Sequence, residues 1–446
     1  MKLALLAGAA LFVGALGVAW STPFWFAPKD TTTKVDISDP ALIAQGEYVA
    51  KAGDCVACHT APGGAAFAGG LGMQTPMGTI YSTNITPDAK TGIGSYDYGD
   101  FERAVRRGMR PDGVHLYPAM PYVSYQIVSD DDVKALYAYF MSGVKPVEKA
   151  NQPTTMPWPL DMRWPLAWWQ LLFAQPRQFA AAPGADARIV RGAYLVEGLA
   201  HCGACHTPRG LAYEEKALAN DPAGNFLSGS VLEGWYAKNL RGERTGLASW
   251  NEADLAAFLK TGRNAHTAAF GSMTDVVAHS LQHLSDDDIT AIAVYLKSAL
   301  PARPGHPAEW VPGPDTTTAA LNAGDYSVTG SLAYSANCAL CHRNDGLGAP
   351  EIYPALKGNS MVIADDPSSL IQVTLAGGEM PKTPAHRMAF TMPAFGGLTN
   401  DQVAEILTFI RNAWGNEASA VTLADVARMR AEIARKPVHY VPEATQ

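Results

Sequence analysis

Six cysteines and three histidines form the most reactive pattern in this 446-residue chain. All six cysteines lie in three Cys-x-x-Cys-His motifs, which span Cys55–His59, Cys202–His206 and Cys338–His342. Two thiols one helical turn apart can add to the two vinyl groups of one porphyrin, while the next imidazole binds the iron. A disulfide, a thioredoxin-like redox pair or half of a zinc site would not require a histidine at the same offset three times. The spacing therefore predicts three covalently bound haem c groups.

Each predicted haem uses two thiols and one imidazole from its own motif. The attachment residues and axial histidines are Cys55, Cys58, His59, Cys202, Cys205, His206, Cys338, Cys341 and His342. A haem that only passes electrons also needs a second axial ligand. A methionine thioether stabilises ferrous iron and raises the potential, which suits an acceptor of electrons from an organic or flavin donor.

The second axial ligand is most restricted for the middle haem. Met273 is the only methionine between Met162 and Met361, so it is the methionine candidate there. Three histidines remain as alternatives, namely His266, His279 and His283. For the first haem we predict Met120, because Pro118 and Pro121 stiffen its loop; the other methionines there are Met73, Met77, Met109 and Met141.

The third haem has four methionine candidates. Met392 is predicted because it precedes a capped helix, as Met120 does, and the other candidates are Met388, which ranks second, Met361 and Met380. Prolines shortly after two of the axial histidines, Pro62 and Pro208, are candidates to offer a backbone carbonyl to the imidazole and so fix its tautomer. Ordinary turn prolines are an equally good interpretation of both positions.

The elements that must hold these residues also repeat three times. Ser129, Ser285 and Thr399 each resemble a helix N-cap, with acidic or amide residues in the first turn. Apolar residues then follow at i, i+3, i+4 and i+7 in all three segments. A glycine precedes each haem motif by eight to ten residues and could permit close helix approach; these are Gly46, Gly192 and Gly330. One fold used three times explains this register.

We therefore predict an all-α protein of three tandem cytochrome c-like domains joined by Pro- and Trp-rich linkers. The expected segments are a leader over 1–21, domains over 36–150, 186–300 and 322–416, linkers over 151–185 and 301–321, and a C-terminal tail over 417–446. An amphipathic helix is expected at 422–435, on a neighbouring domain rather than on a membrane.

The first linker is unusually apolar, since four of the ten tryptophans lie between Met156 and Phe173. Interdomain packing is the favoured interpretation. Contact with lipid, a quinone or a partner subunit is the alternative, because an exposed linker should be polar. A quinone role for Trp168 and Trp169 is a hypothesis that follows from this alternative.

Composition and the N-terminus restrict the cellular context. A formal net charge of -8 argues against nucleic-acid binding and is compatible with a basic redox partner. Lys2 and the uncharged run over 3–20 fit a cleaved signal peptide. Aromatic residues at the end of that run are also typical of a retained membrane anchor. Covalent haem attachment in bacteria occurs outside the inner membrane, so the three haem motifs imply export. A signal peptide and a membrane anchor both agree with export.

Longer strings around these motifs resemble the triheme cytochrome c subunits of membrane-bound periplasmic dehydrogenases of the alcohol, gluconate, sorbitol and fructose type. The resemblance covers nearly the whole mature chain and rests on Cys55–Pro62, Phe67–Leu71, Thr79–Pro87, Leu116–Tyr122, Arg191–Gly198, Cys202–Pro208 and Phe390–Pro393. It implies a large catalytic subunit with PQQ or FAD, and ubiquinone as electron acceptor at the periplasmic face of the inner membrane. A small third subunit is a further candidate partner. The resemblance implies the same three Cys-Cys-His sets and the same three methionines as haem ligands.

Two other functions remain open at this point. A haem enzyme, such as a peroxidase or a small-oxide reductase, would need one open axial site. A free periplasmic electron shuttle would have no fixed partner, which the apolar linker argues against. Spectra distinguish the first case, because three low-spin His/Met haems indicate a relay and a high-spin ferric haem that binds cyanide rapidly indicates catalysis.

Overall fold

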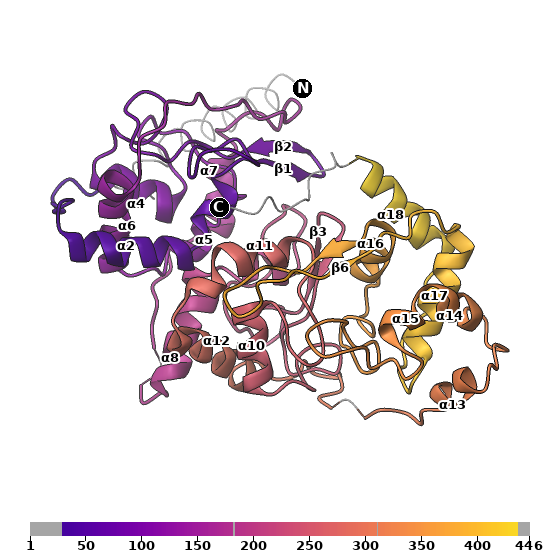
Figure 1. Cartoon of the computed structure of the whole chain (residues 1–446). Coiled ribbons are helices and arrows are strands. Elements are labelled where there is room, and N and C mark those ends of the chain that lie inside the picture. The colour runs from indigo at the N-terminus through magenta and orange to yellow at the C-terminus, as the bar shows by residue number, and fades with distance from the viewer. Residues whose placement is uncertain (1–28, 182, 310, 436–446) are drawn as a thin grey trace, which may run out of the picture. The chain divides into compact units, whose positions relative to one another are not determined.

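The computed structural model describes residues 29–181, 183–309 and 311–435 (Figure 1). The predicted leader over 1–21 lies outside the described residues. The described chain is mainly helical, and its α-helices are α2 (Pro40–Ala52), α3 (Cys55–Cys58), α4 (Tyr98–Arg107), α5 (Tyr122–Tyr125), α6 (Asp130–Ala138), α7 (Leu166–Phe173), α8 (Ala187–Ala193), α9 (Gly203–His206), α10 (Glu252–Thr261), α11 (Ser272–His279), α12 (Asp286–Ser298), α13 (Thr317–Asn322), α14 (Ser331–Asn337), α15 (Ala339–His342), α16 (Ser368–Ala376), α17 (Asn400–Asn412) and α18 (Leu423–Arg435).

Small antiparallel ribbons lie between the helices. The prediction of an all-α fold did not include these ribbons. Each has two strands, and the pairs are β1 (Gly72–Thr75) with β2 (Gly78–Tyr81), β3 (Ser230–Leu232) with β4 (Trp235–Ala237), and β5 (Gly378–Glu379) with β6 (Thr391–Met392). Thr75 pairs with Gly78, so the first ribbon turns through two residues only. These hairpins are too short to form a core of their own, and the helices bury most of the apolar side chains.

The chain forms two compact units. Unit 1 contains the described residues up to 181 together with 197–201 and 210–214, and unit 2 contains the others. The division into three domains at the boundaries given above stays a prediction. Segments from the predicted second and third domains pack together inside unit 2, which explains why they group as one unit.

The three predicted helix caps are confirmed. Ser129, Ser285 and Thr399 are the N-caps of α6, α12 and α17, and each side chain accepts a hydrogen bond from the backbone N–H three residues later. Thr399 also forms a full capping box with Gln402. Such caps satisfy N–H groups that the helix cannot pair internally, so the start of each helix is fixed by its own sequence.

The close helix approach expected at the three glycines is also confirmed. Figure 1 shows α2 beside α6, α8 beside α12 and α14 beside α17. A Cβ atom at Gly46, Gly192 or Gly330 would lie 1.9, 2.1 or 2.3 Å from the carbonyl oxygens of Ala135, Ala291 and Glu405, respectively. Each of these oxygens lies six residues beyond its helix cap, so one packing register recurs three times.

Within unit 1, the apolar segment from Met156 to Phe173 packs in part on residues of the predicted first domain, and packing between two domains stays a prediction. Met156 and Ala167 are buried there. Trp158 nevertheless remains 79% exposed and Leu172 68% exposed. The segment therefore has an inner face that packs and an outer face that does not.

The expected C-terminal helix is present as α18, and it packs within unit 2 against α16 and α17. Val426 and Met429 are buried, and the Arg430 guanidinium donates to Asn400 Oδ1 at 2.8 Å. Its apolar face is thus covered by the preceding domain. None of the helices in the described part of the chain is long and apolar enough to cross a membrane.

Candidate haem-binding sites

The three Cys-x-x-Cys-His motifs adopt one local geometry. A single helical turn, α3, α9 or α15, carries or borders each pair of cysteines. The backbone N–H of each histidine donates to the carbonyl of the first cysteine at 3.0 Å, which holds the motif on that turn. Two thiols and an imidazole on one turn are the arrangement that covalent haem attachment requires.

The axial histidines share one tautomer. Nδ1 of His59 lies 2.7 Å from the carbonyl oxygen of Thr83, and Nδ1 of His206 and His342 lie 2.7 and 2.9 Å from those of Lys238 and Pro354. A carbonyl oxygen can only accept, so Nδ1 carries the proton in each ring. Nε2 then keeps its lone pair for a metal. This feature of the chain itself fits a haem iron at all three motifs.

Burial away from water also keeps the three axial imidazoles neutral. Removal from water lowers the pKa of His59 and His342, and lowers that of His206 to about 4. A charged form of the imidazole is disfavoured away from water. The rings are therefore neutral at physiological pH, and a neutral imidazole is the form that binds iron.

The prediction that the carbonyls of Pro62 and Pro208 accept the hydrogen bonds of these imidazoles is wrong. The acceptors lie farther along the chain, 24, 32 and 12 residues after His59, His206 and His342. The Pro208 carbonyl instead accepts from the backbone N–H of Lys216 at 3.0 Å. Loops that fold back over the motif supply the acceptor, and a short-range sequence pattern cannot identify them.

The first cysteine of each motif lies where a thiolate is unfavourable. Burial raises the pKa of Cys55 and Cys202 to about 12 and that of Cys338 to about 11. A zinc or redox site needs the thiolate form. A thioether carries no charge and avoids this cost, so these positions suit covalent attachment to a porphyrin.

Met120 lies on a constrained loop in unit 1. Its N–H donates to the carbonyl of Tyr117 at 3.2 Å, and the N–H of Tyr122 donates to its carbonyl at 2.8 Å. The Tyr117 hydroxyl donates to Leu160 O at 2.8 Å, and Arg163 stacks over the Tyr117 ring at 3.6 Å. The apolar linker thus holds this loop, and Met120 as ligand stays a prediction.

Met273 and Met392 both lie in unit 2. Met273 is in the first turn of α11, and Met392 ends β6; both side chains are half-buried. Met388, the second choice for the third haem, is 66% exposed. Their roles as ligands remain predictions, as does that of Met120.

The segments around Met273 and Met392 contact each other within unit 2. Thr274 Oγ1 donates to the carbonyl of Glu379 at 3.4 Å, and a Cβ on Gly378 would lie 2.8 Å from the Phe270 ring. The buried Arg263 donates to the carbonyls of Pro381 and Met388 at 3.2 and 2.6 Å. The two predicted methionine loops therefore share one interface.

Sequence reasoning missed two residues beside the second motif. Lys238, whose carbonyl accepts from His206, has a pKa lowered by desolvation to about 7. Its Nζ lies 4.6 Å from the centre of the Trp250 ring and donates to Gly246 O at 3.0 Å. An isolated lysine in a sequence gives no signal of such surroundings.

The second missed residue is His201, which directly precedes Cys202 and belongs to unit 1. It adopts φ 38°, which is uncommon for a residue other than glycine. Its ring lies 5.7 Å from the Tyr125 ring, and the Tyr125 hydroxyl donates to the Gly53 carbonyl at 2.9 Å. Tyr125 therefore links His201, the residue before the second motif, to Gly53, which lies two residues before Cys55 in the first motif.

Comparison with known proteins agrees with this geometry. The cytochrome c family matches residues 327–414. The gluconate 2-dehydrogenase cytochrome c subunit of Pantoea cypripedii is 55% identical over 402 residues, which covers 89% of this chain and 91% of the relative. The cytochrome c subunit of alcohol dehydrogenase (quinone) from Gluconacetobacter polyoxogenes is 48% identical over 398 residues, covering 88% and 85%. The fructose dehydrogenase cytochrome subunit of Gluconobacter japonicus is 38% identical over 413 residues, covering 87% and 82%.

Proposed function

This chain belongs to the family of the cytochrome c subunits of gluconate, alcohol and fructose dehydrogenases, and from that premise we propose that it relays electrons from a periplasmic dehydrogenase subunit to membrane ubiquinone. As a member of this family, it is an electron-transfer subunit and not the catalytic enzyme. The donor in this proposal is a large subunit with PQQ or FAD that oxidises an alcohol, an aldehyde or a sugar. A small third subunit is a further candidate partner. The complex is placed at the periplasmic face of the inner membrane.

The observation that carries the proposal is the threefold repeat of the imidazole arrangement. Each of His59, His206 and His342 is held by a carbonyl oxygen at 2.7 to 2.9 Å, with Nε2 left for iron. Three such positions on one chain support three haem c groups. Haem c supplies reversible one-electron chemistry. The chain attaches each porphyrin, orients its axial base and limits the access of water.

The methionines complete the proposed ligand sets. Met120, Met273 and Met392 are the sixth ligands, so all three irons would be closed to small molecules. A closed iron passes electrons and does not bind peroxide or a small oxide, which separates a relay from a haem enzyme. The name of the relative from Gluconacetobacter polyoxogenes includes a quinone, which supports a quinone acceptor here.

The experiment is to purify the complex from membranes with detergent and identify its large subunit and bound cofactor. Addition of that subunit's substrate should reduce the haems of this chain. Addition of ubiquinone should then reoxidise them. Haems that stay oxidised with substrate, or stay reduced with ubiquinone, would contradict the proposal.

A further inference from the structure

The residue that orients the second axial imidazole also contacts the segment that orients the third. The backbone oxygen of Lys238 accepts from His206 Nδ1 at 2.7 Å. The Lys238 ammonium donates to Gly246 O at 3.0 Å and to Ser360 Oγ, which lies 122 residues further along the chain. Lys238 therefore holds the second axial histidine with its backbone and reaches the predicted third domain with its side chain.

Ser360 belongs to the loop that holds the third axial imidazole. His342 Nδ1 lies 2.9 Å from the carbonyl oxygen of Pro354. The carbonyl of the next residue, Ala355, accepts from Asn359 Nδ2 at 2.8 Å. Asn359 directly precedes Ser360, and the two are 7 and 2% exposed. Buried hydrogen-bond networks of this kind make the segments that they join rigid, so Ser360 and the acceptor of His342 move together.

A second contact holds the same region in place. Two residues before Lys238, in β4, the Tyr236 N–H donates to Ser369 Oγ at 2.8 Å. Ser369 Oγ in turn donates to the carbonyl of Tyr236 at 3.1 Å. Because both backbone groups of Tyr236 are bound to one residue of α16, β4 has a fixed register on that helix. The position of Lys238 beside Ser360 is thus set by its backbone as well as by its side chain.

The Lys238 ammonium is fully used within this link. Its Nζ lies 4.6 Å from the centre of the Trp250 ring, in addition to the two oxygens that it binds. An ammonium has three N–H donors, and the face of a tryptophan ring attracts a cation. The side chain therefore has one favoured position, between the two segments.

The first motif is built differently. His59 Nδ1 lies 2.7 Å from the carbonyl oxygen of Thr83, but Thr83 is exposed. The next residue, Asn84, is held through its N–H by Asn151 Oδ1 at 2.6 Å, inside unit 1. The first axial histidine is thus oriented by residues of unit 1, whereas the acceptors of the second and third belong to segments of unit 2 that bind each other.

We propose that Lys238 is a positioning residue for two haems, because it joins the carbonyl that orients His206 to the loop that orients His342. Lys238 has this role only where both histidines are axial ligands, so the assignment rests on the proposed function. It adds that the second and third haems form a coupled pair within the relay. The Nδ1–H hydrogen bond sets the basicity of an axial imidazole. A change at either acceptor is passed to the other, and such coupling is reciprocal.

The test follows the Nδ1–H protons of the histidines by nuclear magnetic resonance, in the reduced full-length triheme chain labelled with ¹⁵N-histidine. Exchange of these protons with solvent reports how readily each hydrogen bond opens. Lys238→Met removes the ammonium and keeps the apolar stem, and Ser360→Ala removes its acceptor and keeps the charge. Each should accelerate exchange at both His206 and His342 about fivefold, the scale set by one hydrogen bond.

The double variant distinguishes one link from two independent effects. If Lys238 and Ser360 act through one hydrogen bond, the double variant should exchange at the rate of the single variants, and the two effects should not multiply. Ser360→Ala should also raise the midpoint potentials of the second and third haems, because a weaker Nδ1–H bond makes the imidazole less basic and favours ferrous iron. The potential of the first haem should not change.

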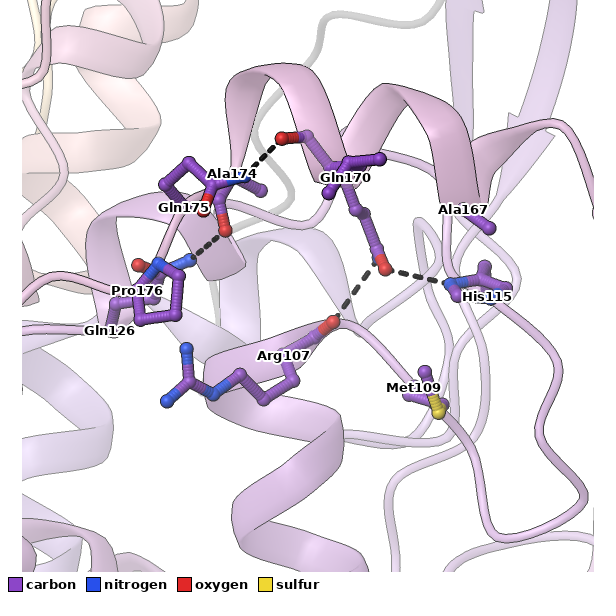
Figure 2. A pocket seen from close by; sticks show the side chains of 10 residues that line it. Arg107, Met109, His115, Gln126, Ala167, Gln170, Ala174, Gln175 and Pro176 are labelled. Atoms are coloured by element: carbon purple, nitrogen blue, oxygen red, sulfur yellow. Dashed lines mark hydrogen bonds between the residues drawn. The ribbon is translucent and has the colours of Figure 1, made fainter. Parts of the chain in front are cut away.

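Two histidines of unit 1 are internal controls. His59 is held by the carbonyl of Thr83, and His115 Nδ1 lies 2.7 Å from Gln170 Oε1 (Figure 2). Their Nδ1–H protons should exchange at the wild-type rate in every variant. Lys216→Met, at an exposed position, is the matched control substitution and should leave all of these protons unchanged.

Acceleration at His206 alone, multiplied effects in the double variant, or equal acceleration at His59 would overturn the role of Lys238. If Lys238→Met does not fold, Ser360→Ala decides by itself, and an unchanged rate at His206 overturns the role. The porphyrin ring current shifts the ring protons of an axial histidine, so the same spectra show whether His206 and His342 bind haem. Without that shift the proposed function fails; with it, unlinked exchange removes only the coupled pair.

Discussion

The predicted methionine loops of the two units are held in different ways. In unit 1, the Met120 loop is held by the apolar linker, through Tyr117 and the stacked Arg163. In unit 2, the segments around Met273 and Met392 hold each other, through Thr274 and the carbonyl of Glu379. One loop thus borders a segment with an exposed apolar face, and the other two border one another.

The difference has a physical consequence for the proposed relay. Two loops that share an interface respond together, because a shift in one changes the packing of the other. The Met120 loop is instead held by the apolar linker within unit 1. Changes within unit 2 should therefore affect two haems, and changes in the linker should affect one.

The largest effect is expected for Arg263→Ala in unit 2. Arg263 is 2% exposed and donates to the carbonyls of Pro381 and Met388. Its loss leaves buried acceptors without donors and should cost roughly 2–5 kcal/mol of unfolding free energy. Thermal unfolding measures this loss, and potentiometric titration should show shifts at the second and third haems.

The control for that experiment is Arg428→Ala, because Arg428 is exposed and pairs with Asp425 across one helical turn. It should leave all three potentials unchanged. A shift confined to one haem in Arg263→Ala would contradict the shared interface of the two loops.

In unit 1 the corresponding change is Arg163→Ala. It removes the contact with the Tyr117 ring and the hydrogen bond to His115 O at 3.1 Å. We expect a loss of about 1–2 kcal/mol and a potential shift at the first haem alone. Titration of the three haems checks this, and an equal shift at the second haem would show that the units do not respond separately.

Helix caps should show no difference between the units. Ser129→Ala in α6 and Ser285→Ala in α12 each remove a hydrogen bond to the N–H three residues on, at 3.2 Å in both cases. Each should cost about 1 kcal/mol. Thermal unfolding of Ser→Thr variants at the same positions is the control, since threonine also caps. Unequal losses of unfolding free energy for the two alanine variants would indicate that the caps of α6 and α12 do not contribute equally.

Much of the repeated framework could be predicted from the sequence because it is local. Hydrogen-bonding rules over one helical turn predict the caps at Ser129, Ser285 and Thr399. Steric rules predict that a helix can approach closely at the three glycines, each of which packs on the carbonyl six residues after a cap. The interface between Thr274 and Glu379 could not be predicted, because it joins residues 105 positions apart. The prediction of the carbonyl acceptors for the axial histidines failed for the same reason. Pro62 and Pro208 lie near these histidines in the sequence, but the carbonyls that accept from them belong to Thr83 and Lys238, which are distant in the sequence and close in space.

The smallest predicted effect concerns Lys238 in unit 2. A protonated ammonium near the second haem favours the reduced iron, so the potential should fall as pH rises through about 7, the pKa of Lys238. We expect a change on the order of tens of millivolts. Lys238→Met should abolish this dependence, whereas Lys216→Met, at an exposed position, should retain it. The pH dependence of each midpoint potential is the measurement, and an unchanged slope in Lys238→Met would refute the role of this side chain.

A relay of three closed haems is tested by the haem content and the spin state of the purified chain. Haem is counted per chain as the pyridine derivative, and the ferric protein is examined by electron paramagnetic resonance. We predict three haem c groups per chain, all low-spin with His/Met ligation. Fewer than three haems, or a high-spin ferric haem that binds cyanide rapidly, would contradict it.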